Sequence, residues 1–173
     1  MDLVAQFESA ARAAGATVER VTASPDAVAT AVERAAGVGA RIAVAEPLDL
    51  DPSLLDGCRR LPGVVTKRSK PALAMANVGV TDAFGCVASS GSVCVAADGE
   101  AGYVSLLTRL HIVLARAADM VERPGDVFQP DRLGGKGLRR NFVFVTGPSA
   151  TADMGPLVRG VHGPHQLHVL LLD

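Results

Sequence analysis

The first half of the chain alternates short segments of helical and of strand periodicity, and this alternation constrains the fold more than any other feature. Apolar residues recur at helical spacing from 3 to 14, and Gly15 then ends the pattern before an extended segment at 17 to 21. Further helices are expected to begin at Ser24-Pro25 and at Asp51-Pro52, since each pair is a capping residue followed by proline. Helices that separate strands in this way imply crossover connections. The sequence therefore predicts an α/β fold with a mostly parallel sheet flanked by helices.

The second half adds strands of strongly apolar composition. Residues 78 to 96 are expected to form a strand, a turn at 89 to 92 and a second strand, as a hairpin or bulged pair. Residues 122 to 140 hold prolines, glycines and basic residues, and we expect a loop there. The remaining expected elements are helices at 25 to 36, 51 to 60, near Leu73 and at 101 to 107, and strands at 41 to 45, 64 to 66, 110 to 115, 141 to 145 and 167 to 172.

Length and composition indicate one folded unit. With 173 residues, 49% of them hydrophobic and 20% charged, the chain can bury a single core, which predicts one domain over residues 1 to 173 and excludes disorder. Apolar runs are short and interrupted, so no membrane span is expected, and the first residues lack a basic start followed by an apolar run. We therefore expect a cytoplasmic protein.

Charge and cysteine content exclude several classes of partner and cofactor. A formal net charge of −1 with scattered basic residues and no Trp argues against nucleic acid and against an anionic membrane as partners. Cys58, Cys86 and Cys94 are an odd number without CxxC spacing, which argues against disulfides and against a zinc or iron-sulfur site built by this chain alone. We expect buried thiols and no cofactor bound by this chain, so redox cofactors would belong to another chain.

A turn rich in small polar residues follows one of the apolar strands. Gly147 and Pro148 shape the turn, Ser149 and Thr151 offer hydroxyls, and Asp153 adds a carboxylate. Ligands of open α/β sheets lie beyond the carboxyl ends of strands, where such a loop forms an anion-binding concavity. The same residues are also typical of a helix cap and a closed turn. On residue spacing alone, an anion-binding loop and a helix cap are about equally favoured.

A second dense segment, residues 160 to 165, precedes the last strand. His162, beside Gly163, can donate to an anion or act as an acid-base group. A metal site with His165 and His168 is less favoured, because proline interrupts any helix that would align the imidazoles and no carboxylate or thiol lies nearby in sequence.

Two further groups of residues have both a functional and a structural interpretation. Ser90, Gly91 and Ser92 can cradle a ligand through their backbone amides, although small polar residues in a tight turn need no functional explanation. His111, in an apolar strand, is more often a satisfied structural histidine than a catalyst.

Four segments occur in a fixed order along the second half of the chain: GVTDAFGCVASSGSVCV, SLLTRLHIVL, FVTGPSATADM and GVHGPHQLHVLLLD. Together they resemble the LUD domain of the lactate utilization protein C family, over residues 78 to 173. The resemblance implies an α/β fold similar to the NagB/RpiA/CoA-transferase-like group. It also implies a role in bacterial oxidation of L-lactate to pyruvate beside iron-sulfur partner proteins, with this chain as the member that carries no cluster.

The sequence departs from the family pattern at acidic positions. Ser89 stands where the family usually has an acidic residue, and Gly155 stands where a second one commonly follows. The family's LPxxHI pattern appears in this chain without its proline, because Thr108 follows Leu107. A mechanism with a glutamate nucleophile or base, as in the CoA transferases of the wider fold group, is therefore not favoured.

The leading hypothesis is an accessory or regulatory subunit of a lactate-oxidising system. The alternative is a stand-alone enzyme that acts on a small anionic substrate, such as a sugar phosphate or an acyl thioester, with Ser149, Thr151 and His162 binding the anion and Asp153 as the acid-base group. A small-anion sensor without turnover is a third hypothesis. A homo-oligomer is compatible with each of them.

We expect one cleft on which residues 146 to 153 and 160 to 165 converge with the serine turn, residues 90 to 92, and we expect no metal ligand. The candidate ligand-binding residues are Ser90, Gly91, Ser92, Gly147, Pro148, Ser149, Thr151, Asp153, His162 and Gly163, of which Asp153 and His162 are also the catalytic candidates.

Overall fold

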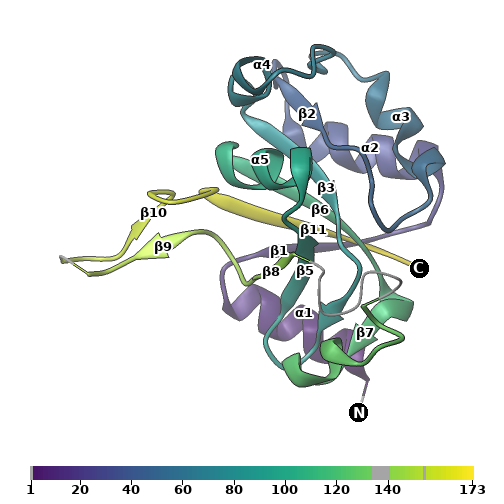
Figure 1. Ribbon diagram of the computed structural model, residues 1–173, viewed down its shortest axis with the longest axis vertical. Helices are drawn as coiled ribbons and strands as arrows, with labels where there is room; N and C mark the ends of the chain where they lie inside the picture. Colours follow the sequence, from purple (N-terminus) through teal and green to yellow (C-terminus); the bar gives the residue numbers. More distant parts are fainter. Residues whose placement is uncertain (1, 134–140, 154) are drawn as a thin grey trace.

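The computed structural model describes residues 2–133, 141–153 and 155–173 (Figure 1). The α-helices are α1 (Leu3–Ala13), α2 (Pro25–Ala36), α3 (Asp56–Arg59), α4 (Lys70–Ala74) and α5 (Gly99–Leu107), and the 3-10 helices are η1 (Pro52–Leu55), η2 (Ala117–Asp119) and η3 (Pro124–Phe128). The strands are β1 (Thr17–Val21), β2 (Ile42–Val44), β3 (Val78–Asp82), β4 (Cys86–Val87), β5 (Ser92–Ala96), β6 (Leu110–Arg116), β7 (Met120–Val121), β8 (Phe142–Val145), β9 (Ala150–Thr151), β10 (Val158–Arg159) and β11 (Gln166–Leu172).

Five strands form a parallel sheet in the order β1-β11-β6-β3-β2, with β6 at its centre. The final strand β11 inserts between β1 and β6, so the two ends of the chain meet within the sheet. Two predicted helix starts are confirmed, since Ser24 Oγ accepts a hydrogen bond from the Ala27 N–H at 3.3 Å and an Asp51 carboxylate oxygen accepts one from the Ser53 N–H at 2.9 Å. The predicted α/β class with a mostly parallel sheet flanked by helices is confirmed.

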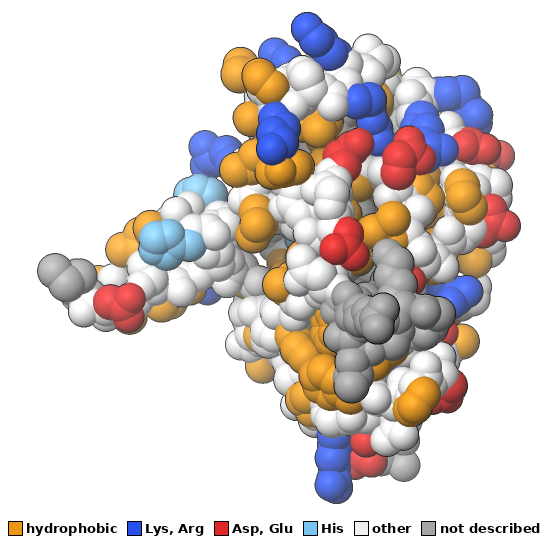
Figure 2. All heavy atoms as spheres, viewed as in Figure 1, with side chains coloured by type: hydrophobic (Ala, Val, Ile, Leu, Met, Phe, Trp, Pro, Cys, Tyr) orange, Lys and Arg blue, Asp and Glu red, His pale blue; other side chains and the backbone are white. Residues whose placement is uncertain are grey.

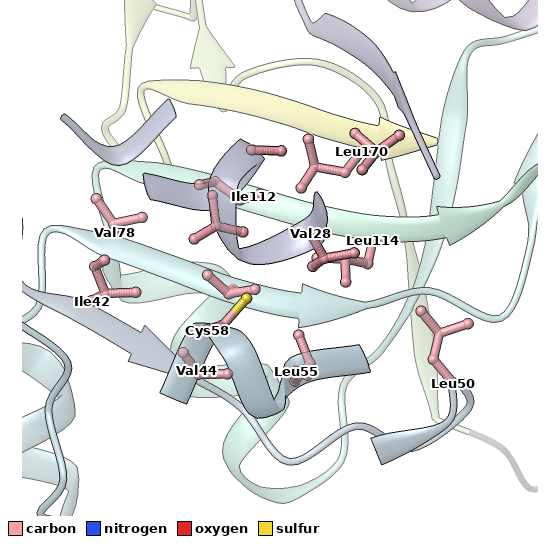
Figure 3. Close-up of a cluster of buried hydrophobic side chains, with 14 of the residues drawn as sticks. Val28, Ile42, Val44, Leu50, Leu55, Cys58, Val78, Ile112, Leu114 and Leu170 are labelled. Carbon is pink, nitrogen blue, oxygen red and sulfur yellow. The ribbon is translucent and has the colours of Figure 1, made fainter. Parts of the chain in front are cut away.

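Helices α2 and α3, with η1, cover one face of the parallel sheet. Alternate residues of the central strands point to this face, and Ile112, Leu114 and Leu170 pack there with Val28 of α2 and Leu55 of η1 (Figure 3). All five side chains are fully buried. Removing this apolar surface from water is the main force that holds the helices on the sheet.

The opposite face carries α1, α4, α5 and a second, smaller sheet. Val113 of β6 and Val169 of β11 pack there against Phe7 of α1 and Val93 of β5. The second sheet has the order β7-β4-β5-β8, antiparallel at β4–β5 and β5–β8 and parallel at β4–β7. The predicted hairpin over residues 78 to 96 is therefore formed by β4 and β5, whereas β3 belongs to the parallel sheet.

Two predicted elements differ from the structure, and one lies partly outside it. Residues 64 to 66 form no strand, because Val64 makes only a single parallel bridge to Ile42. Residues 51 to 60 form η1 followed by the four-residue α3 rather than one continuous helix. The predicted loop at 122 to 140 contains η3, and its residues 134 to 140 lie outside the described ranges.

Strand β8 is an edge strand of the second sheet. Its Val143 and Phe144 side chains are 43% and 38% exposed, respectively. The chain runs from β8 through residues 146 to 165 to the amino end of β11, so this loop does not lie beyond the carboxyl edge of the parallel sheet. The prediction that this loop lies beyond the carboxyl ends of parallel strands is therefore wrong. The helix-cap alternative is wrong as well, because strand β9 follows the turn.

Strands β9 and β10 pair antiparallel and form an arm that projects from the body (Figure 1, at the left). The arm leaves Leu157, Val158 and Val161 exposed by 62%, 52% and 51%. Over the described parts of the chain, no helix combines the length and the apolar character that crossing a membrane requires.

Candidate functional site

Two glycines let the serine turn and the turn after β8 approach helix α1 closely. A Cβ added at Gly91, where φ is +67°, would lie 2.2 Å from the backbone nitrogen of Ala11. A Cβ at Gly147, where φ is +69°, would lie 2.1 Å from the carbonyl oxygen of Ala14. Both the positive φ and the backbone contact require glycine. Helix α1 thus holds the two turns near each other at the base of the arm.

A chain of three hydroxyls joins these turns. Ser90 Oγ lies 2.7 Å from Ser92 Oγ, which in turn lies 2.6 Å from Thr146 Oγ1. Each hydroxyl has one donor and two acceptor positions, so the two hydrogen bonds of the chain use two of its three protons. The expected approach of the serine turn to the loop after β8 is found here, at Thr146.

Ser149 connects the outgoing and the returning strands of the arm. Its N–H donates to the Pro164 carbonyl at 2.9 Å, and its own carbonyl accepts from the Gly160 N–H at 2.8 Å. A Cβ at Gly163 would lie 3.1 Å from the Ser149 Cβ. The expected convergence of residues 146 to 153 with residues 160 to 165 is therefore found around Ser149.

Thr151 and Asp153 lie farther out along the arm. Asp153 is exposed, and with Thr151 and His162 it lines a cavity of about 340 Å³ that does not include Ser149. The predicted acid-base carboxylate and the predicted anion-binding serine thus line different cavities, and His162 lines both. The catalytic roles of Asp153 and His162 stay predictions.

A cavity of about 280 Å³ lies between α5, β8 and the base of the arm. The sequence-predicted residues in its lining are Gly147, Pro148, Ser149, His162 and Gly163. Apolar side chains such as Leu106, Val143 and Leu167 form much of the wall, and no Arg, Lys, Asp or Glu occurs among the described residues that line it. The cavity is suited to an uncharged group rather than to the anion expected from the loop sequence, because it offers no countercharge.

His111 is the most buried polar group in this lining. It is 1% exposed, its Nε2 lies 2.7 Å from Thr81 Oγ1, and its Nδ1 has no hydrogen-bond partner among the described residues. Burial lowers the pKa of His111 to about 3, so the imidazole is neutral at neutral pH. An unpaired buried nitrogen costs roughly 1–3 kcal/mol. The interpretation of a satisfied structural histidine therefore holds for Nε2 and is wrong for Nδ1.

Sequence patterns alone do not assign Ser105, Leu106 and His111 to this site. Ser105 and Leu106 come from α5, which the chain reaches well before the arm, so only the tertiary fold brings them to the cavity. The sequence does single out His111, because it is the one uncharged polar residue in an otherwise apolar segment of β6.

The cysteines and histidines do not gather around one point. Within the described ranges, no group of three or more His, Cys, Asp or Glu side chains is placed to hold a metal ion. All three cysteines are buried, as predicted, and burial raises the pKa of Cys58 to about 11 and raises that of Cys86 as well. Thiols held in the protonated form are poor ligands, because the thiolate is the species that binds a metal. That this chain binds no cofactor stays a prediction.

The structure defines an α/β protein whose parallel sheet carries a small appended sheet and a projecting arm. The family model of the LUD domain matches residues 62–172, which include both turns, α5, β6 and the arm. The match spans more than half of the chain, and the chain belongs to the LUD-domain family.

The same fold occurs in a solved structure. The chain is similar to the crystal structure of a DUF162-family protein from Deinococcus radiodurans at 1.70 Å resolution, with a TM-score of 0.69 and 21% sequence identity. The superposition covers 99% of this chain and 96% of the Deinococcus chain. This likeness shows the fold alone, and it extends over the residues that precede the LUD-domain match. A comparison with curated protein sequences gives no match.

Proposed function

We propose that this chain is an accessory or regulatory component, without a cluster of its own, of a bacterial system that oxidises L-lactate to pyruvate together with iron-sulfur proteins. The observation that carries the proposal is the LUD-domain match over residues 62–172. The match supports a role related to lactate utilization, and the turns at the base of the arm belong to the matched segment.

The chemistry of the cysteines supports the assignment of the iron-sulfur clusters to partner proteins. Oxidation of lactate to pyruvate removes two electrons and two protons, and the electrons require a redox cofactor as acceptor. Cys58 and Cys86 are buried with raised pKa values, whereas a cluster needs several thiolates at one point. We therefore assign the clusters to partner chains.

The arm is the surface that we propose for contact with an iron-sulfur partner. A two-stranded hairpin is only marginally stable by itself, and this one presents Leu157, Val158 and Val161 to solvent. Contact with another protein would bury these apolar side chains and gain their transfer free energy.

A growth experiment tests the proposed role. A strain that lacks this protein is expected to grow poorly on L-lactate as the carbon source and normally on pyruvate, because only the oxidation step is missing. The wild-type chain should restore growth, and the double variant Leu157→Asp, Val158→Asp should not. A matched control is Val38→Asp, since Val38 is fully exposed away from the arm. Normal growth of the deletion strain on L-lactate contradicts the proposal.

A further inference from the structure

A second cavity, of about 430 Å³, adjoins the base of the arm, and Pro148 lines both it and the cavity that contains His111. Its lining residues come from the amino edge of the parallel sheet, where β1 and β11 begin, and from α2 and the arm. The role proposed above makes no use of this cavity. Its lining differs in kind from that of its neighbour, since it contains Glu19, Arg34, Arg159 and His168.

Arg159 is folded back from the arm onto the body. A Cβ built at Gly15 would lie 3.5 Å from Nη2 of Arg159 and 3.4 Å from Cδ of Pro148, so the guanidinium of the exposed Arg159 side chain lies against the wall of the cavity. Among the described residues, no carboxylate pairs with this guanidinium. A cation is therefore held at the cavity without a countercharge of its own.

The opposite wall supplies a buried hydrogen-bond donor. Thr17 Oγ1 lies 2.6 Å from Nδ1 of His168 and 3.4 Å from the Leu167 carbonyl oxygen, and the ring proton lies on Nε2 when the hydroxyl donates to Nδ1 rather than to that carbonyl. Nε2 is buried, lies 3.5 Å from the nearer carboxylate oxygen of Glu19 and makes no hydrogen bond within the described structure. Glu19 itself is bound by Arg34. In that tautomer the imidazole N–H lies at the wall of the cavity, where it faces Glu19 at a distance longer than a normal hydrogen bond.

We propose that this cavity binds a small anion, a carboxylate or a phosphate, held by the Arg159 guanidinium and by the Nε2–H of His168. Two guanidinium groups face one carboxylate in the lining, which leaves a net positive charge for the ligand to neutralise. A planar guanidinium donates two parallel hydrogen bonds to either oxyanion, and such charge-assisted bonds are stronger than neutral ones. The cavity has room for an anion of a few heavy atoms beyond its oxygens, because it holds about 430 Å³.

The anion site also joins the arm to the body. Arg159 belongs to β10, whereas His168 belongs to β11 and Arg34 to α2. A ligand held by Arg159 and His168 restrains the arm relative to the sheet. The site does not depend on the lactate role, although L-lactate is one of the anions that fit its chemistry.

Calorimetric titration of the whole chain tests the site. The probes are inorganic phosphate, acetate and L-lactate at constant ionic strength, with chloride as the background anion. We expect saturable binding of at least one probe, weakened roughly tenfold or more by Arg159→Gln. The matched control is Arg60→Gln, which removes an exposed arginine outside the cavity and should leave the affinity unchanged. Binding of phosphate alone identifies a phosphate site, and binding of acetate or lactate identifies a carboxylate site.

Proton NMR of the histidine rings tests where on the protein the anion binds. The chain has four histidines, and addition of the bound probe should shift the Cε1–H signals of His165 and His168, which line the cavity, more than that of His111, which does not. No saturable binding of any probe, or equal affinity of wild type and Arg159→Gln, overturns the proposal. The growth experiment tests the contact with partner proteins, whereas this titration tests the anion site, so the two proposals can fail independently.

Discussion

His111 makes folding stability depend on pH in a way that one substitution isolates. Its side chain is almost fully buried, and burial lowers its pKa from the ordinary value of 6.5 to about 3. Between these two values the unfolded chain binds a proton that the folded chain excludes, so acidification favours unfolding. The stabilisation from the neutral ring is present above the unfolded pKa of 6.5 and is lost as the pH falls from there toward about 3.

The size of the effect follows from the gap between the two pKa values. One pKa unit corresponds to about 1.36 kcal/mol. Between pH 7 and pH 5 the His111 contribution to the free energy of unfolding should drop by about 2 kcal/mol. The pKa of His168 is also lowered, chiefly by burial, and His168 acts in the same direction. Because His168 is unchanged in a His111 variant, its contribution cancels when the variant and the wild type are compared.

Urea unfolding of wild type and His111→Gln at pH 7 and at pH 5 measures this difference. Circular dichroism is the suitable signal, since the chain has no Trp. The wild type should lose about 2 kcal/mol more than the variant on acidification, whatever the stability of the variant at pH 7. His111→Asn provides a second non-titrating side chain if glutamine does not fit. Equal losses in the wild type and the variants would refute the burial of a neutral imidazole.

Three further substitutions test close packing and buried hydrogen bonds in the fold, each by urea unfolding. Gly91→Ala should lower the free energy of unfolding by about 3 kcal/mol or more, because the new Cβ meets the α1 backbone at positive φ. Gly99→Ala, at positive φ in open space, should lower it by only about 1 kcal/mol. Similar losses in the two variants would contradict the close contact. Asp82→Ala should cost about 3 kcal/mol, since the buried carboxylate accepts hydrogen bonds from the amides of residues 48 to 50, and a loss under 1 kcal/mol contradicts that role. Ser92→Ala should cost about 1 kcal/mol by breaking the hydroxyl chain, and unchanged stability would show that the chain contributes nothing.

The parts of the fold that depend on local chemistry are readable from the sequence. Ser24 and Asp51 cap the elements that follow them, because a short polar side chain before proline satisfies the first free amides wherever the chain goes next. The apolar strand that contains Ile112 is buried on both faces in any parallel sheet, so its composition alone identifies it.

Pairing between distant segments is not readable in the same way. The apolar residues of β8 are compatible with a central or an edge strand, and only its partner β5 decides that Phe144 lies at an edge. The two-residue strands of the arm are too short for any periodic pattern. The predicted serine and glycine turns meet as expected at Thr146 and Ser149, whereas Asp153 does not, because the arm carries it outward.

The charged cavity illustrates the same limit. Arg159 reaches Gly15 across almost the whole length of the chain, and this contact exists only because β11 inserts beside β1. In Figure 2, histidine side chains are seen on the surface of the arm, yet the sequence does not say which of them faces a cation or a cavity. The positively charged lining that anion binding requires thus occurs in the neighbouring cavity rather than at the hydroxyl chain.

The proposed place of this protein in lactate oxidation is tested most directly by co-purification. Tagged wild-type chain, isolated without oxygen from its own organism grown on L-lactate, is expected to carry proteins that contain iron and acid-labile sulfide. The Leu157→Asp, Val158→Asp variant should recover much less of both, and Val38→Asp should recover as much as the wild type. Recovery of the wild-type chain alone, from cells that grow on lactate and contain such proteins, would contradict the account.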